Sequence, residues 1–299
     1  MSKQSLLDFL ICRTSTYEKI DELSLTGGGG DFQMLFSPVC ERPIFHTGYD
    51  VFGVHWTQAK PTSHYTPGQE PVIKDIEDWR EQVRFPVVDR FDWGYVAEQA
   101  KHLDRESKVI TCTLAIGPFE RASSLTTFED CLVNAISESE DFAELIGAVV
   151  DYKIDIVRHL HQHACPDFIN LHDDWGTSTS TFFSPELWRE TIKPHTKRLY
   201  DAIHDLGMLV GQHSCGRIEA IVGDMVEIGC NAWEAQENCN DIPLLREQYG
   251  NKLCIIAPPP PKGDELGENE SEDASAAPDP AILPMNYRPY VDAPAFLYA

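Results

Sequence analysis

The sequence predicts an α/β protein built as a TIM-type (β/α)8 barrel, and three observations support this prediction. Short apolar runs alternate with segments of helical periodicity between residues 108 and 257, which is typical of parallel α/β folds. The runs are apolar throughout rather than alternating, as expected when helices cover both faces of a sheet. Polar residues follow several runs, and no Gly-x-Gly-x-x-Gly follows the first, so a barrel is favoured over an open sheet.

Strands are expected where a short apolar run ends at polar residues or glycine. In chain order, these runs are 108–114, 167–171, 208–213, 231–235 and 253–257. Two short extended pieces around a turn are also expected within 42–58. About six strands are convincing, whereas a closed barrel needs eight. Either the N-terminal pieces supply the others, or the barrel is incomplete at its C-terminal end.

Helices are expected where apolar residues recur every three or four positions. The segments with this spacing or with helical character are 76–79, 92–103, 127–137, 140–163, 218–228 and 243–249. Ser139 is a suitable N-cap for the long helix. Ser184, followed by proline and glutamate, opens a further helix, because serine caps, proline suits the first position and an acid suits the first turn. Gly207 ends that helix, and Pro194 should kink it.

The two ends of the chain differ from this regular part. Residues 1–41 form a poorly defined N-terminal segment, in which the four glycines at 27–30 lack a phosphate-loop pattern and are expected to form a flexible loop. The barrel is expected over 42–257. Residues 258–299 are rich in proline and acids, and this composition predicts a largely disordered tail.

The composition restricts the class of protein. With 42% hydrophobic and 24% charged residues, the 299-residue chain is typical of a globular protein. The net charge of -24 argues against nucleic acid or an anionic membrane as a partner. No transmembrane run or signal-peptide core is apparent, so we expect a cytoplasmic protein. Nine cysteines without a regular pattern indicate reduced thiols rather than a disulfide framework.

The most informative segment is 207–216, where an apolar run ends in His213-Ser-Cys215 before a glycine. Side chains two positions apart on a strand share a face. Imidazole and thiolate are zinc ligands, and a catalytic zinc site needs a third. Cys239, after the next strand, is the best local candidate, and Glu237 is an alternative. The competing interpretation is a buried strand that happens to contain both residue types.

Two further candidate groups follow other strands. Asp173 and Asp174 point in different directions because they are adjacent, so one can cap a helix or accept a hydrogen bond from a loop. The other can orient a ligand, act as a base or accept from His213. Arg121 can bind an acidic group of a substrate, or it can pair with a neighbouring acid. His172 is interpreted as structural rather than catalytic.

These segments resemble those of the uroporphyrinogen decarboxylase-like superfamily, and they are closest in motif to its cobalamin-dependent methyltransferase branch. The resemblance covers about residues 49 to 257 and depends on three stretches in order. These stretches are Asp173-Asp174-Trp-Gly-Thr, the segment 184–194, and His213-Ser-Cys215-Gly with its following helix. Weaker matches occur at 49–54 and 117–121.

The resemblance implies a TIM barrel in which His213 and Cys215 bind zinc, which activates a thiol or another heteroatom. A small-molecule substrate would then exchange a methyl group with a corrinoid carried by a partner protein. The branch usually takes a third zinc ligand, a cysteine, from near the end of the barrel, whereas no cysteine follows Cys254 here. The alternatives are a cofactor-independent decarboxylase of the uroporphyrinogen type and a non-catalytic relative that binds a ligand or a partner.

Overall fold

The computed structural model describes residues 2–15, 23–25, 31–39, 41, 47–58, 65–235 and 239–257. The predicted tail, the glycine run at 27–30 and Glu237 lie outside these residues. Among the described residues, no helix is both long enough and apolar enough to cross a membrane.

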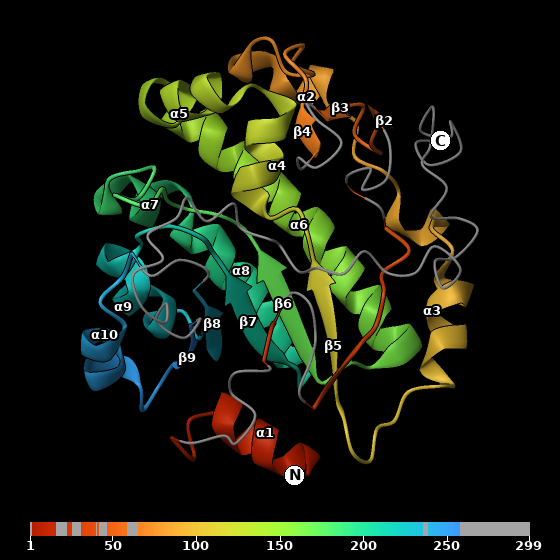
Figure 1. Cartoon of the computed structure of the whole chain (residues 1–299). Coiled ribbons are helices and arrows are strands. Elements are labelled where there is room, and N and C mark those ends of the chain that lie inside the picture. Colours follow the sequence, from red (N-terminus) through yellow and green to blue (C-terminus); the bar gives the residue numbers. More distant parts are fainter. Residues whose placement is uncertain are drawn as a thin grey trace.

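A six-stranded parallel sheet forms the centre of the molecule. Its strand order is β1-β5-β6-β7-β8-β9, and the sheet curls into half of a barrel (Figure 1). The strands are β1 (Phe32–Met34), β5 (Val109–Leu114), β6 (Phe168–His172), β7 (Leu209–His213), β8 (Ala232–Glu234) and β9 (Cys254–Ile256). The predicted α/β class is therefore confirmed, and in the described part of the chain the barrel is incomplete.

Five of these strands coincide with predicted runs, whereas β1 was not predicted. It pairs in parallel with β5, with Phe32 opposite Val109. Because β1 has only three residues and lies in a segment without periodicity, its sequence carries no local strand signal. The sheet gains this strand only through pairing with a strand far away in the sequence.

Helices cover the sheet, and α6 and α8 pack together along it (Figure 1). The longer helices are α1 (Lys3–Leu10), α3 (Trp93–Ala100), α4 (Pro118–Leu125), α5 (Phe128–Ser137), α6 (Ser139–Ala164), α7 (Pro185–Thr191), α8 (Lys193–Asp205), α9 (Glu219–Glu227) and α10 (Ile242–Tyr249). Shorter turns are η2 (Ile76–Asp78), α2 (Trp79–Gln82) and η3 (Val88–Arg90).

Local residues determine where the helix after Ser184 begins and where it is interrupted. The Ser184 hydroxyl accepts a hydrogen bond from the Leu187 amide, so serine caps α7 as predicted. Proline removes a backbone donor and clashes with the preceding turn. The helix is accordingly divided at Ile192, and Pro194 lies in the first turn of α8.

The N-cap of the long helix was predicted wrongly. Ser139 is already helical in α6, and Glu138 occupies the cap without a side-chain hydrogen bond to the helix. The preceding helix α5 ends at the same junction. Since two helices meet there with almost no loop, the local pattern gives no clear boundary.

A small antiparallel sheet lies between β1 and β5 in the chain. It comprises β2 (Gly48–Tyr49), β3 (His55–Gln58) and β4 (Tyr65–Pro67), in that order. The two extended pieces and the turn predicted within 42–58 correspond to β2 and β3. Asp50 closes the turn, because its carboxylate accepts hydrogen bonds from the amides of Phe52 and Val54.

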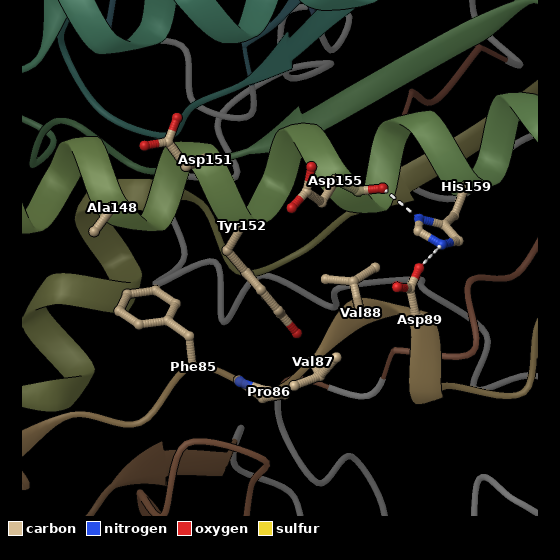
Figure 2. Close-up of a pocket in the computed structure, with 10 residues that line it drawn as sticks. All are labelled: Phe85, Pro86, Val87, Val88, Asp89, Ala148, Asp151, Tyr152, Asp155 and His159. Carbon is tan, nitrogen blue, oxygen red and sulfur yellow. Dashed lines mark hydrogen bonds and ion pairs between the residues drawn. The ribbon is translucent and has the colours of Figure 1, made fainter. Parts of the chain in front are cut away.

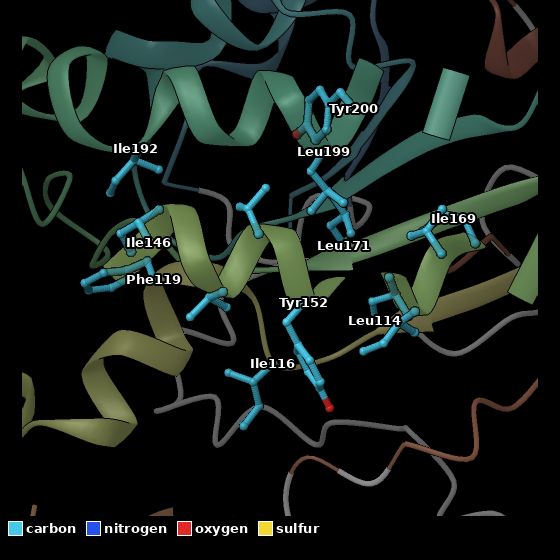
Figure 3. Packing of buried hydrophobic residues seen from close by; sticks show 14 of the residues in the cluster. Leu114, Ile116, Phe119, Ile146, Tyr152, Ile169, Leu171, Ile192, Leu199 and Tyr200 are labelled. Atoms are coloured by element: carbon cyan, nitrogen blue, oxygen red, sulfur yellow. The ribbon is translucent and has the colours of Figure 1, made fainter. Parts of the chain in front are cut away.

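The main core lies between the sheet and α6. In Figure 3, Ile146 of α6 lies near Phe119 of α4 and Ile192, and Leu199 of α8 lies near Leu171 of β6. All five side chains are buried. This packing fixes the strands relative to one another, and with them the side chains at the strand ends.

Candidate active site

Polar side chains from three neighbouring strands meet at the C-terminal edge of the sheet. His172 ends β6, His213 ends β7 and Glu234 ends β8. The parallel register places His172 opposite His213, and His213 opposite Glu234. Active sites of barrel enzymes lie at this edge of their strands.

His213 and Cys215 lie side by side, as their spacing predicted. The Cys215 Sγ is 3.4 Å from the His213 Nε2. The other ring nitrogen, Nδ1, lies 3.2 Å from the Glu234 Oε2. Because a carboxylate oxygen accepts, Nδ1 donates this hydrogen bond and Nε2 carries the lone pair. Glu234 thus holds His213 in the tautomer that can bind a metal through Nε2.

Asp174 reaches the same group from the loop after β6. Its Oδ1 accepts a hydrogen bond of 2.7 Å from the Cys215 amide and lies 3.6 Å from the His213 Nε2. The Asp174 side chain is 28% exposed, whereas His213 is buried. The carboxylate therefore lies at the boundary between the buried imidazole and solvent.

His172 is the member of the site that sequence analysis interpreted as structural. Its ring stacks on His213 with centroids 4.3 Å apart and planes 17° from parallel. Its Nδ1 lies 3.1 Å from the Glu120 Oε2. Within the described part of the chain, His172, Asp174 and His213 form a group whose potential metal-binding atoms all lie within 4.8 Å of one another. The available signal was its position at a strand end, two residues before Asp174.

Asp173 points away from this group, toward the start of α4. It accepts hydrogen bonds from the amides of Phe119 and Glu120 and from the Trp175 indole. Burial, and secondarily the nearby Glu120 charge, raises its pKa to about 7. At Gly117, an added Cβ would lie 2.1 Å from the Asp173 Cβ. Asp173 therefore binds the helix terminus, and the adjacent carboxylates diverge as expected.

Arg121 lies apart from the strand-end group. It is fully buried, and its guanidinium contacts Asp50 at 2.6 Å and Glu41 at 3.3 Å. Glu41 also contacts the buried Lys153 of α6. Arg121 further stacks over the Phe52 ring. Of the two alternatives for Arg121, the structure shows the pairing with neighbouring acids. These ion pairs connect the small sheet to the helices.

Cys239 lies in the loop after β8 and is half-buried. Its Sγ is 3.5 Å from the Asn240 Nδ2, and the same amide nitrogen donates to the Gly216 carbonyl. Cys239 is therefore near the loop that carries Cys215. Within the described residues, the group that could hold a metal consists of His172, Asp174 and His213, and neither Cys239 nor Cys215 belongs to it.

A separate hollow of about 540 Å3 lies on the outer side of α6. Figure 2 shows Tyr152 and Asp155 of α6 facing Phe85 and Asp89 across it, with His159 at one end. The His159 imidazole bridges the Asp155 carbonyl and the Asp89 carboxylate. None of the strand-end residues lines this hollow, so it is distinct from the candidate site.

Comparison with known proteins identifies the family. The model of the uroporphyrinogen decarboxylase (URO-D) family matches residues 61–256. The chain belongs to the URO-D family. This range contains all the strand-end residues described above, and it confirms the resemblance found in the sequence motifs. No curated protein matches the sequence.

A solved structure agrees with the URO-D assignment at the level of the fold. A methyltransferase from Methanosarcina mazei superposes with a TM-score of 0.56 at 17% identity, over 75% of this chain. The matched part covers 63% of the length of that methyltransferase. The URO-D protein described here therefore shares its fold over less than two thirds of that protein.

Proposed function

We propose that this URO-D family protein is a methyltransferase, in which zinc assists methyl transfer between a corrinoid protein and a small methylated substrate or thiol. The observation that carries the proposal is the distance of 3.4 Å between the His213 Nε2 and the Cys215 Sγ. The methyltransferase fold of the neighbour from Methanosarcina mazei supports the same reaction class.

The donor atoms fit zinc in type and spacing. In a tetrahedral zinc site with bonds of about 2.0–2.3 Å, adjacent ligand atoms lie about 3.4–3.6 Å apart. The separation between His213 Nε2 and Cys215 Sγ falls in this range. Imidazole nitrogen and thiolate sulfur are also preferred zinc donors. His213 and Cys215 are therefore the residues that would hold the metal.

The surrounding residues prepare these two ligands. Glu234 fixes the His213 ring through Nδ1, and its other oxygen accepts from the Leu25 amide. Asp174 fixes the Cys215 backbone. The contact with a carboxylate such as Glu234 raises the basicity of a ligating imidazole and fixes its direction.

Zinc, when bound, would hold a thiol as its nucleophilic thiolate at neutral pH.

The transfer itself requires a sulfur nucleophile and a methyl donor. A methylated corrinoid, carried by a partner protein, would supply an electrophilic methyl group, and the carbon–cobalt bonding pair would stay with the corrinoid. His213 and Cys215 would hold the zinc that keeps the accepting thiol deprotonated, with its proton released to solvent. The strand-end residues lie at the C-terminal edge of the sheet, so the corrinoid protein would dock over this edge.

Metal-free decarboxylation is less well supported by the geometry. That reaction needs cations to hold substrate carboxylates, and Arg121 is fully buried against Asp50 and Glu41. Of the two candidate acids, Asp173 is 1% exposed and bonded to α4 and Trp175, and the more accessible Asp174 accepts from the Cys215 amide. The sulfur–imidazole pair would have no role in such a reaction.

The proposal is tested by following loss of methylcobalamin absorbance in the presence of zinc and a panel of small thiols. Wild type should demethylate the corrinoid, and Cys215→Ala should fall to the background rate. Cys165→Ala is the matched control, because Cys165 is an exposed thiol that follows α6 at the opposite edge of the sheet. Equal rates in wild type and Cys215→Ala, or a wild type at background with every thiol, would contradict the proposal.

A further inference from the structure

We propose that the groove between α5 and α7 is the docking surface for a partner protein, which presents an amphipathic helix whose apolar face is flanked by lysine or arginine. The groove has a volume of about 420 Å3. In the described part of the chain, no strand-end residue of the candidate site lines it. The inference concerns protein recognition and needs neither the zinc nor the methyl transfer of the proposed function.

An apolar stripe on α5 forms one wall of the groove. Leu132 and Ile136 line it, and Leu132 lies one helical turn from both Phe128 and Ile136. The side chains of Phe128 and Ile136 are 48% and 75% exposed. Residues at this spacing share one face of a helix. Contiguous exposed apolar surface of this kind marks sites of protein interaction.

The other wall comes from α7 and the loop before it. Phe182, Phe183 and Leu187 line the groove from this side. The Phe182 ring packs edge-on against the Phe128 ring with centroids 5.1 Å apart, so the two walls touch at the start of α5. The two helices lie next to each other (Figure 1). A groove with two apolar walls accommodates the apolar face of a third helix.

The charges around the groove select the kind of partner. Glu129 and Asp130 lie in the first turn of α5, and Glu190 of α7 lines the groove. All three are exposed. Residues 122–152, which include all of α5, contain no lysine or arginine, and Arg189 of α7 is paired with an acid of α9. Lysine or arginine beside the apolar face of the incoming helix would complement this acidic border.

The same charges disfavour a second copy of this chain as the occupant. In a symmetric dimer, one patch meets the identical patch of the other copy. The acidic borders of the two grooves would then face each other, and like charges across an interface are unfavourable. The net charge of -24 on each chain adds to this repulsion. A basic partner avoids both costs.

The groove adjoins the candidate site through the loop after β6. This loop spans residues 173–184 and carries Asp174 near its start. Phe182 and Phe183, near its end, line the groove. A helix bound in the groove would therefore contact the loop that places Asp174 next to His213. Docking here brings a partner close to the site without covering the strand ends directly.

The test is fluorescence anisotropy of the full chain with two labelled helical peptides. One peptide contains leucine and lysine, and the other contains leucine and glutamate in the same apolar pattern. Wild type should bind the lysine peptide and should not measurably bind the glutamate peptide. Ile136→Lys should weaken binding of the lysine peptide more than about tenfold.

The matched control is Leu244→Lys, because Leu244 is a 45% exposed apolar residue of α10. It adds the same charge outside the groove and should change binding less than about twofold. Thermal unfolding checks that both variants are folded, which the exposure of Ile136 and Leu244 favours. Equal weakening by the two variants, equal binding of the two peptides, or no binding of the lysine peptide would overturn the proposal.

Sedimentation equilibrium tests the competing occupant. A wild-type chain that remains a monomer agrees with a basic partner helix in the groove. A wild-type dimer that Ile136→Lys dissociates would make a second copy the occupant and overturn the proposal. None of these measurements involves zinc or a corrinoid, so failure of this inference leaves the proposed methyl transfer untouched.

Discussion

The chemistry of the site depends on how carboxylates orient two imidazoles. Glu234 contacts the Nδ1 of His213, and Glu120 contacts the Nδ1 of His172. Each contact selects a tautomer and a ring direction, and it leaves the Nε2 of that ring as the nitrogen able to accept a hydrogen bond or bind a ligand. Residues outside the H-x-C motif, such as Glu234, therefore decide whether the His213 imidazole of the motif is oriented to bind a metal.

Replacing Glu234 by glutamine should therefore weaken metal binding without unfolding the protein. The amide can still accept from Leu25, but it no longer supplies a charged acceptor for His213. Loss of such outer support typically reduces metal affinity about 10–100-fold. Zinc titration of Glu234→Gln should show this loss, and an unchanged dissociation constant would mean that Glu234 does not tune His213.

Asp173 should give the stability of the metal-free protein a specific pH dependence. Its pKa is raised from 3.8 in a model compound to about 7 in the fold. The folded state therefore binds a proton at Asp173 more tightly than the unfolded state. The contribution of Asp173 to the free energy of unfolding is greatest below about pH 4 and falls as the pH rises toward 7.

This dependence can be measured by denaturant unfolding, across that pH range, of protein whose metal has been removed with a chelator. Asp173→Asn cannot ionise, so its free energy of unfolding should lose the downward slope, although the variant also loses an acceptor at the start of α4. A wild type and a variant with the same slope would show that Asp173 does not titrate in this window.

For single residues, the sequence predicted the contacts between residues that are close in the chain and missed those between residues that are far apart in it. The spacing of His213 and Cys215 predicted their contact, and the adjacency of Asp173 and Asp174 predicted their divergence. The roles of His172 and Glu234 depend on strand register, which joins residues that are far apart in the chain. Nothing in the local pattern around either residue encodes that register.

At the scale of elements, the loop after β7 controls the position of Cys215. Gly216 has a φ of +89°, and an added Cβ would lie 2.3 Å from the backbone carbon of Gly176. Gly207, which ends α8, has a similar φ of +78° but no atom within 4 Å of the added position. Both glycines have the left-handed backbone that strains any residue with a Cβ, and they differ only in the steric contact that an added Cβ would make.

Alanine at these two positions should therefore have different costs. Gly207→Ala should lower the free energy of unfolding by about 1 kcal/mol through the left-handed backbone alone. Gly216→Ala should cost clearly more, about 3 kcal/mol, and should also weaken zinc binding by displacing Cys215. Denaturant unfolding measures both, and equal losses would mean that the contact with Gly176 is relieved without cost.

Elements with their own capping or periodic pattern were predictable, and elements without one were not. Ser184 and Pro194 specify where α7 begins and where it gives way to α8. The helix α4 was missed because its first turn, Gly117 to Glu120, was interpreted only as a segment after a strand. Pro118 at the first helical position and Glu120, whose side chain accepts from the Gly117 amide, are local signals of this start. Only the acceptor for the amides of Phe119 and Glu120, Asp173 from another strand's loop, is not visible in the local sequence.

At the scale of the whole molecule, buried charges join the small N-terminal sheet to the half-barrel. Asp50, in the turn before β3, contacts Arg121 of α4 and the Trp56 indole. Both Asp50 and Arg121 have fully buried side chains. Breaking a buried ion pair from one side leaves an uncompensated charge, which typically costs about 3–5 kcal/mol.

Asp50→Asn should accordingly lower the free energy of unfolding by about 3 kcal/mol. Asp201→Asn is the control, because the Lys197–Asp201 pair is about half exposed and such pairs contribute less than about 1 kcal/mol. Thermal or denaturant unfolding distinguishes the two. If Asp50→Asn costs no more than Asp201→Asn, the buried network does not hold the two parts together.

The fold class followed from composition and periodicity because each of the five predicted strands has its own apolar run. The contact between the two sheets did not follow, since the sequence left open whether Arg121 binds a substrate or pairs with a neighbouring acid and did not indicate which acid. Its burial depends on Asp50 and Glu41, which come from the part of the chain with the weakest pattern.

The most direct test of the central claim is elemental analysis of zinc in purified wild type and in Cys215→Ala. We expect about one zinc per wild-type chain and a large loss in the variant, with the fold retained. Equal zinc content in the two proteins would contradict a metal site built on His213 and Cys215, and with it the proposed methyl transfer.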